Sequence, residues 1–439
     1  MLNLKTINLT GWILAAGFLV SACSGDKVLP EGKRISVLDP IAAVKPDVAN
    51  SSAHISIPAS VTNRNWLQEG YNAQHIQSNF AVGSSFQKQW DSSFGKGGSK
   101  REFLISKPLI ADGRIYTLDA AGLLSAFNLQ NGEVLWDIKL RSDNDNVDDT
   151  ALKGAGIALD NGTIYATTGY GVVYAVSAKK GEILWQKSLQ TPLRIAPMVA
   201  NGNVYIQSVD NKFYALKAAS GEEQWKYDIS LENTTLVGGA PAAYAPQLDM
   251  VVTGFSNGEI QAFNATLGSP LWSDVLISNR QAYSSTFLDT IKSAPVIDGQ
   301  TVYAIGNSNI VTAIDLRTGM RKWEREIGSI STPLLVGSTL YIVTNANDLV
   351  AVNKENGDIL WATPIRPEKK SADTIIFSPL MLGGRLVVTL SDGTLQLYMP
   401  QTGKLLSTID VGEELNAAPI VADGYIVFVT TDADLIAYK

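Results

Sequence analysis

Cysteine and histidine are almost absent from this chain of 439 residues. Cys23 is the only cysteine, and His54 and His75 are the only histidines. One cysteine excludes an intrachain disulfide. The shortage of both residue types removes the usual ligands of zinc and the usual nucleophile–base pairs of hydrolases. The sequence therefore favours binding over catalysis.

Positive charge is also in short supply. The chain has 35 Lys and Arg against 42 Asp and Glu, a formal net charge of −7. Nucleic-acid binding depends on neutralising phosphates with basic side chains, so we expect no nucleic-acid partner. Hydrophobic residues make up 45% of the chain, which is enough to bury a large core.

The N-terminus has the features of a secretion signal, and we assign residues 1–22 to it. Lys5 precedes the apolar run Trp12–Val20, which is too short to span a bilayer comfortably. Small residues lead directly into Cys23, as in the lipobox of bacterial lipoproteins. We predict that Cys23 is lipidated (palmitate being one of the acyl groups). Ser24, in place of Asp, predicts export to the outer membrane. A buried cysteine in an ordinary secreted protein is the alternative.

Residues 23–80 mix Pro, Ser, Ala and Asn with little periodicity, which is typical of a tether. Trp66, Tyr71 and His75 near its end indicate that the last part packs on the folded body. We interpret His75 as a packing residue and not as a metal ligand.

Residues 81–439 contain a repeat, and this is the most informative feature of the sequence. Each unit has an apolar run, a turn, an alanine at a fixed place, and a glycine four residues before a tryptophan. The tryptophans are Trp136, Trp185, Trp225, Trp272, Trp323 and Trp361. The glycines are Gly132, Gly181, Gly221, Gly268, Gly319 and Gly357, and the alanines are Ala126, Ala175, Ala215, Ala262, Ala313 and Ala351.

The repeat has the pattern of a four-stranded sheet. Alternating apolar and polar residues predict half-buried strands, and Asn-Gly, Ser-Gly and Thr-Gly pairs predict tight hairpin turns. The small alanine allows neighbouring sheets to approach, and the tryptophan fills the gap between them. Four strands in each unit of about 38 to 51 residues are typical of one propeller blade. The predicted fold class is therefore all-β.

The repeat count predicts how the ring closes. Seven full units run to Ser407, and an eighth stops at Lys439 without a fourth strand. Residues 85–90, which end at Trp90, read as a fourth strand with no repeat before them. We predict that this N-terminal strand completes the last blade of an eight-bladed propeller and leaves no open sheet edge.

The repeat resembles the pyrroloquinoline-quinone (PQQ) propeller repeat. With the lipobox, the eight blades and the chain length, the sequence is similar to the BamB family of propeller lipoproteins. The resemblance implies a scaffold, anchored by lipid in the outer membrane and facing the periplasm, that needs no cofactor or metal. It implies partners in the POTRA domains of BamA, the other subunits of the Bam complex and nascent outer-membrane proteins. Its role would be to assist insertion of β-barrel outer-membrane proteins.

Two other functions remain open, because enzymes and scaffolds share this fold. A quinoprotein dehydrogenase would need a ring-centre set of oxygen ligands for calcium, a base carboxylate and often paired cysteines. Asp289 and Asp315 are isolated carboxylates, and the oxygen-rich stretch at 143–149 lacks the glycine and glutamate of a calcium loop. An unrelated periplasmic propeller that binds other partners is the second alternative.

The family resemblance implies that BamA docks on two neighbouring interblade loops, here residues 231–241 and 287–293. In the first loop Leu236 keeps an apolar anchor, whereas Val237 stands where arginine is expected. The second loop has Leu288 and Asp289, the latter one place from its expected position. Thr290 and Lys292 stand where carboxylates are expected. These six residues are the predicted partner-binding set, and variable loops without a binding role are the alternative.

Overall fold

The computed structural model describes residues 44–47, 55–83, 85–98, 104–141, 156–229, 239–277, 290–367 and 374–439. All of them belong to Ala43–Lys439, the second of two compact units; the first is Met1–Ala42. Within these described ranges, no helix has the length and apolar character needed to cross a membrane. Cys23 and the 143–149 stretch lie outside the described residues.

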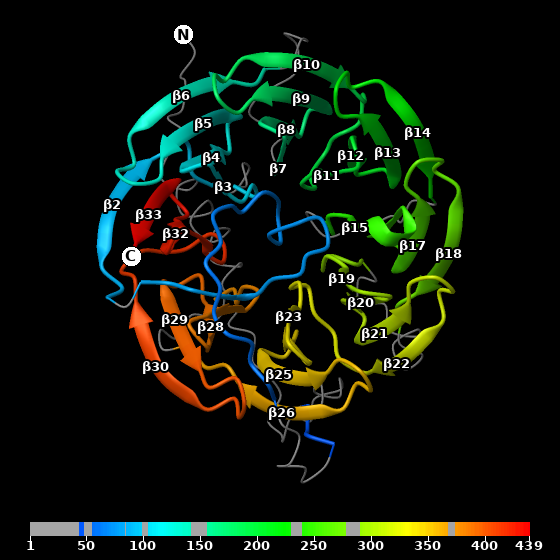
Figure 1. The fold of residues 1–439 in the computed structure, drawn as a ribbon, viewed down its shortest axis with the longest axis vertical. Coiled ribbons are helices and arrows are strands. Elements are labelled where there is room, and N and C mark those ends of the chain that lie inside the picture. Colours follow the sequence, from blue (N-terminus) through cyan, green and yellow to red (C-terminus); the bar gives the residue numbers. More distant parts are fainter. Residues whose placement is uncertain are drawn as a thin grey trace, which may run out of the picture. The chain divides into compact units, whose positions relative to one another are not determined.

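Eight antiparallel four-stranded sheets stand around a central axis as the blades of a propeller (Figure 1). Blade 1 contains β3 (Leu109–Ala111), β4 (Arg114–Leu118), β5 (Leu123–Asn128) and β6 (Val134–Lys139). Blade 2 contains β7 (Gly156–Asp160), β8 (Thr163–Thr167), β9 (Val172–Ser177) and β10 (Ile183–Ser188). Blade 3 contains β11 (Met198–Ala200), β12 (Asn203–Gln207), β13 (Lys212–Lys217) and β14 (Glu223–Asp228). Blade 4 contains β15 (Ala243–Ala245), the 3₁₀ turn η1 (Pro246–Leu248), β16 (Met250–Gly254), β17 (Glu259–Asn264) and β18 (Pro270–Val275).

The second half of the ring repeats this order, with the first strand of each blade innermost. Blade 5 contains β19 (Val296–Asp298), β20 (Thr301–Gly306), β21 (Ile310–Asp315) and β22 (Arg321–Arg325). Blade 6 contains β23 (Leu334–Val336), β24 (Thr339–Val343), β25 (Asp348–Asn353) and β26 (Ile359–Pro364). Blade 7 contains β27 (Leu380–Leu382), β28 (Arg385–Thr389), β29 (Thr394–Tyr398) and β30 (Leu405–Asp410), and the short β1 (Asn79–Phe80) pairs with β27. Blade 8 contains β31 (Ile420–Ala422), β32 (Tyr425–Val429), β33 (Asp434–Tyr438) and β2 (Lys88–Ser93).

The structure confirms the predicted closure of the ring. Strand β2 pairs antiparallel with β33, and Trp90 lies opposite Ala437. A strand from near the start of the described chain thus completes a blade whose other three strands come from its end. The pairing leaves blade 8 with the same four strands as its neighbours, as the eight-bladed fold requires.

The repeated alanine, tryptophan and glycine together join one blade to the next. In blade 2, Trp185 of the outer strand pairs with Ala175, and a β-bulge lies between Ile183 and Trp185. The indole N–H of Trp185 donates to the carbonyl oxygen of Ala218 in blade 3 over 2.9 Å. Gly221 of blade 3 lies against the same indole, and a Cβ added there would be 2.6 Å from the ring. We call this arrangement the tryptophan lock.

The lock occurs at seven of the eight interfaces between blades. The indole N–H donors are Trp90, Trp136, Trp185, Trp225, Trp272, Trp323 and Trp361, each bonded to a backbone carbonyl of the next blade over 2.8 to 3.1 Å. Only glycine can serve at the matching position, because the φ angle is positive and the indole leaves no room for a Cβ.

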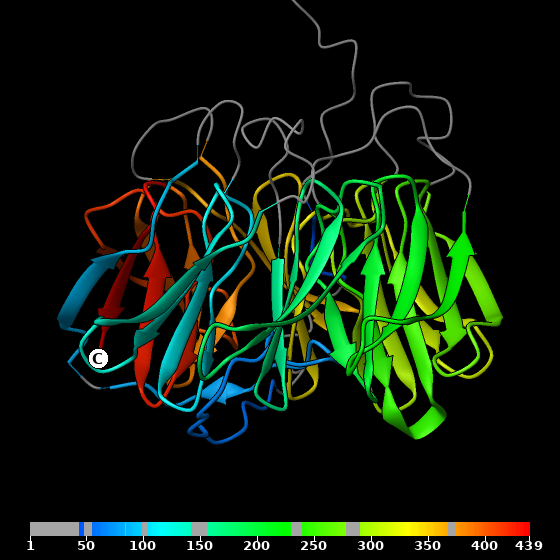
Figure 2. The same ribbon diagram turned by 90° about the horizontal axis from the view of Figure 1, so that it is seen from above.

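Residues 55–83 form a segment, here called the strap, that crosses one end of the ring (Figures 1 and 2). The strap contacts all eight blades, mostly by backbone hydrogen bonds. The pairs, in blade order, are Trp66 with Ile110, Leu67 with Leu159, Gln68 with Val199, Ala73 with Tyr244, Gln74 with Ile297, Ile55 with the cluster around Leu334, Phe80 with Gly383, and Asn63 with Asp423. The segment from 55 to 80, which the sequence placed in the tether, is therefore folded against the ring.

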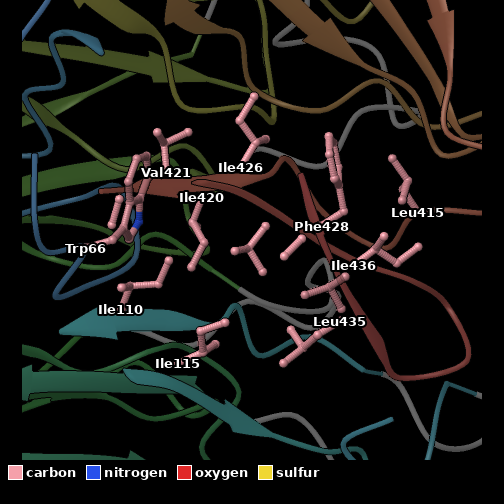
Figure 3. Packing of buried hydrophobic residues seen from close by; sticks show 14 of the residues in the cluster. Trp66, Ile110, Ile115, Leu415, Ile420, Val421, Ile426, Phe428, Leu435 and Ile436 are labelled. Carbon is pink, nitrogen blue, oxygen red and sulfur yellow. The ribbon is translucent and has the colours of Figure 1, made fainter. Parts of the chain in front are cut away.

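Trp66 anchors the strap in the core. Its side chain is 4% exposed and packs in one cluster with residues of blades 1, 7 and 8. Figure 3 shows the indole beside Ile110 of blade 1 and Ile420 and Val421 of blade 8. Tyr71 and Phe80 contact the same indole, with ring centroids 5.3 and 5.6 Å away. Burying an aromatic of this size contributes strongly to docking of the strap.

Candidate functional site

The two loops predicted to bind a partner lie next to each other where their described residues begin. Residues 239–241 lead into blade 4, and residues 290–295 lead into blade 5. Gly239, Thr290 and Ile291 line the same cavity of about 50 Å³. Ala240 and Ile291 also belong to one buried cluster. The two loops therefore arise side by side on the ring.

Four of the predicted partner-binding residues, Leu236, Val237, Leu288 and Asp289, lie outside the described residues. Thr290 is 3% exposed, and its hydroxyl donates to the carbonyl oxygen of Ser256 over 3.3 Å. This side chain therefore lies at the base of the loop, and its role in partner binding stays a prediction. Neighbouring Ile291 is buried as well and bonds to Phe255 through its backbone.

Lys292 lines a second cavity, of about 580 Å³, at the centre of the ring. Most of the lining comes from segments that precede the innermost strands of seven blades, together with Glu69 of the strap. These segments end in a proline that introduces the strand: Pro108, Pro197, Pro241, Pro295, Pro333, Pro379 and Pro419. Proline fits the start of a strand because it has no N–H to donate to the ladder.

The central cavity is positively charged. Lys107, Arg194 and Lys292 line it with one carboxylate, Glu69. The Lys107 ammonium is 2.6 Å from the Glu69 carboxylate. Burial lowers the pKa of Lys292, Lys107 lowers it further, and Glu69 offsets part of the shift. Sequence reasoning missed Lys107, Arg194 and Glu69, although the recurring proline marks where the first two would lie.

The described residues contain no group of three or more His, Cys, Asp or Glu side chains that could hold a metal ion. Asp315 lies at a hairpin turn, where the backbone and hydroxyl of Thr318 donate to its carboxylate and lower its pKa. It is a turn-capping residue. His75 is 2% exposed, and its Nδ1 lies 2.8 Å from the carbonyl oxygen of Pro295, which agrees with the predicted packing role.

A family model described as "Outer membrane protein assembly factor BamB" matches residues 147–363. The BamB of Burkholderia pseudomallei is 24% identical over 355 residues, which are 80% of this chain and 88% of that protein. The BamB of Escherichia coli K12 is 27% identical over 349 residues, which are 78% of this chain and 86% of that protein.

Solved structures agree on the fold. BamB from Moraxella catarrhalis superposes with a TM-score of 0.66 at 17% identity, covering 80% of this chain and 99% of that one. A quinohemoprotein alcohol dehydrogenase from Comamonas testosteroni gives a TM-score of 0.65 at 12% identity, covering 86% and 81%. These likenesses show the propeller alone, since a scaffold and an enzyme fit almost equally well. The family model and the relatives that span most of both chains show that this chain is similar to the BamB family of PQQ-repeat propellers.

Proposed function

We propose that this chain is a non-catalytic scaffold for outer-membrane protein assembly and that it docks on the POTRA domains of BamA through its 231–241 and 287–293 loops. The family supports the assembly role, because the relatives are named outer membrane protein assembly factors. The single observation that supports the docking site is the shared cavity at the base of the two loops. Two loops that arise together can form one continuous contact surface around an apolar anchor.

The proposal assigns the contacts to the part of each loop beyond its base. Leu236 and Leu288 supply apolar anchors, and Val237 and Asp289 lie beside them. Thr290 holds the second loop in place, because its buried hydroxyl ties the loop to the Ser256 carbonyl of blade 4. Lys292 lines the ring centre at the inner end of the same loop.

Lipidation of Cys23 would hold the scaffold at the outer membrane, facing the periplasm. Several acyl chains on one residue give a stable anchor, since each buried methylene contributes about 0.8 kcal/mol. The other Bam subunits and nascent outer-membrane proteins are the further partners in this proposal. Residues 23–54 would link the lipid to the strap.

Co-purification of the full-length lipoprotein with BamA tests the docking site. We expect Leu236→Glu combined with Asp289→Arg to reduce recovery of BamA at least fivefold with an unchanged melting temperature. The matched control is Leu267→Glu, because Leu267 is 74% exposed in the β17–β18 hairpin turn of the same blade 4. Normal recovery with the double variant would refute this docking site.

The same preparation tests the anchor and the absence of catalysis. Cys23→Ser should lose acyl labelling and membrane retention while the melting temperature stays the same. Retention of both by the variant would disprove lipidation at Cys23. A bound quinone spectrum or alcohol-dependent dye reduction would instead favour the dehydrogenase.

A further inference from the structure

The ring-centre cavity holds more positive charge than its walls neutralise. Three cations and one carboxylate line it, in a chain whose formal net charge is −7. Glu69 is paired with Lys107. Neither the Lys292 side chain nor the Arg194 side chain forms a hydrogen bond or an ion pair with any described residue. Two cations in one cavity therefore lack a direct ion-pair partner among the described residues, and Glu69 is the one carboxylate they share with Lys107.

Such an arrangement has an energetic cost. A charged group that is partly removed from water loses hydration, and an opposite charge is the usual compensation. The lowered pKa of Lys292 reflects this cost, because burial and the nearby Lys107 both disfavour the charged ammonium. An anion in the cavity would offset both effects by favouring the charged ammonium, and all three cations would attract it.

The rest of the wall is mostly apolar. The apolar side chains include Leu104, Ile105, Ile195, Ile330, Ile376 and Phe377. Glu69 of the strap is part of the lining, so the cavity reaches the segment that crosses one end of the ring. A concave, largely apolar site of about 580 Å³ with a few polar groups has the size and character of sites that bind small molecules.

We propose that this cavity binds a small organic carboxylate, with its apolar body against the aliphatic wall and its anionic group held by Lys292 and Arg194. The inference is independent of the proposed BamA docking, although Gly239 and Lys292 at the inner ends of the two loops also line the cavity. It also requires no metal and no chemical step.

Fluorine NMR of the full chain in lipid nanodiscs tests the proposal. The probe is 4-(trifluoromethyl)benzoate, and its uncharged match is 4-(trifluoromethyl)benzyl alcohol, with empty nanodiscs as the baseline. We expect saturable line broadening of the benzoate that weakens at least fivefold in Lys292→Gln and in Arg194→Gln. Broadening of the alcohol should be the same in all three proteins.

The control variant is Lys180→Gln, because Lys180 lies on a hairpin turn, its side chain is 63% exposed, and it does not line the cavity. It should bind the benzoate like the unmodified protein. The proposal is overturned if the benzoate shows no saturable binding, or if Lys292→Gln and Arg194→Gln bind it as Lys180→Gln does. Melting temperatures within one degree across the variants would show that the losses come from the site and not from unfolding.

Discussion

Seven of the eight interfaces between blades are held together in one way, and the eighth is held together in another. At the seven, a tryptophan indole lies on a glycine of the next blade and donates to its backbone, as at Trp185 and Gly221. Between blades 7 and 8 the corresponding residue is Ser407, which pairs with Leu397. No lock of this kind is possible there, because the outer strand of blade 8 is β2 and no hairpin turn joins it to β33.

The N-terminal part of the body replaces the lock at the eighth interface. Strand β1 pairs with β27 of blade 7, and β2 pairs with β33 of blade 8, so the chain between them bridges the two blades. Phe86 in this bridge stacks on Tyr438 with ring centroids 4.6 Å apart. The comparison shows that seven interfaces are encoded within the repeat, whereas the eighth depends on a segment outside it.

Stepwise N-terminal truncation tests the eighth interface and should have the largest effect on the melting temperature. Removing residues 1–54 should leave the melting temperature almost unchanged. Removing residues 1–83 should lower it substantially, because the strap and buried Trp66 and Phe80 are lost. Removing residues 1–92 should abolish cooperative unfolding, since β2 is lost and β33 becomes an open edge. Circular dichroism melts of the three proteins measure this order, and equal melting temperatures would show that the eighth interface does not need the N-terminal segment.

Substitution of two glycines in blade 3 tests how much the tryptophan lock contributes to stability, with a smaller expected effect. Gly202 and Gly221 have φ angles of +72° and +73°, but only Gly221 faces the Trp185 indole. Gly202→Ala should cost about 1–2 kcal/mol from the left-handed backbone alone. Gly221→Ala should cost about 1–3 kcal/mol more, because the methyl group displaces the indole. Urea denaturation measures both values, and an equal loss of unfolding free energy in the two variants would contradict the lock.

The smallest expected effect is the pH dependence that comes from His75 of the strap. Burial lowers the pKa of His75 below its ordinary value of 6.5 in the folded chain. The unfolded chain therefore takes up a proton first as the pH falls below about 6.5, and the free energy of unfolding decreases. His75→Gln should reduce the loss of stability between pH 7.5 and 5.5 in urea titrations. His54 is present in both proteins, so an unchanged pH dependence would rule out a contribution from His75.

The ring and its closure could be predicted because the residues that form them recur in the sequence repeat. A lock needs a tryptophan, an alanine opposite it and a glycine in the next blade, and those residue types recur at fixed spacing. Trp90 without a preceding repeat, and Ala437 without a following tryptophan, identified the two halves of blade 8. The strands pair in the predicted way for the same reason.

The path of the strap and the central cavity could not be predicted in the same way. The strap binds the blades mainly through backbone groups, as between Leu67 and Leu159, and such contacts leave no pattern of side chains. The charges of the cavity come from Lys107, Arg194 and Lys292, which are far apart in sequence and meet only when the ring has closed. The burial of Thr290 could not be predicted either, because a single polar residue in a loop gives no indication of burial.

The pairing of β2 with β33 also affects the order in which the chain folds. Ser85 and Lys439 are 354 residues apart, yet the Ser85 hydroxyl donates to the Lys439 carbonyl oxygen. Contacts of such high sequence separation slow folding, because a very long loop must close before they form. During synthesis, β2 stays without its partner until β33 has been made. We therefore expect ring closure to come late in folding, with the edges of β2 and β33 unpaired until then.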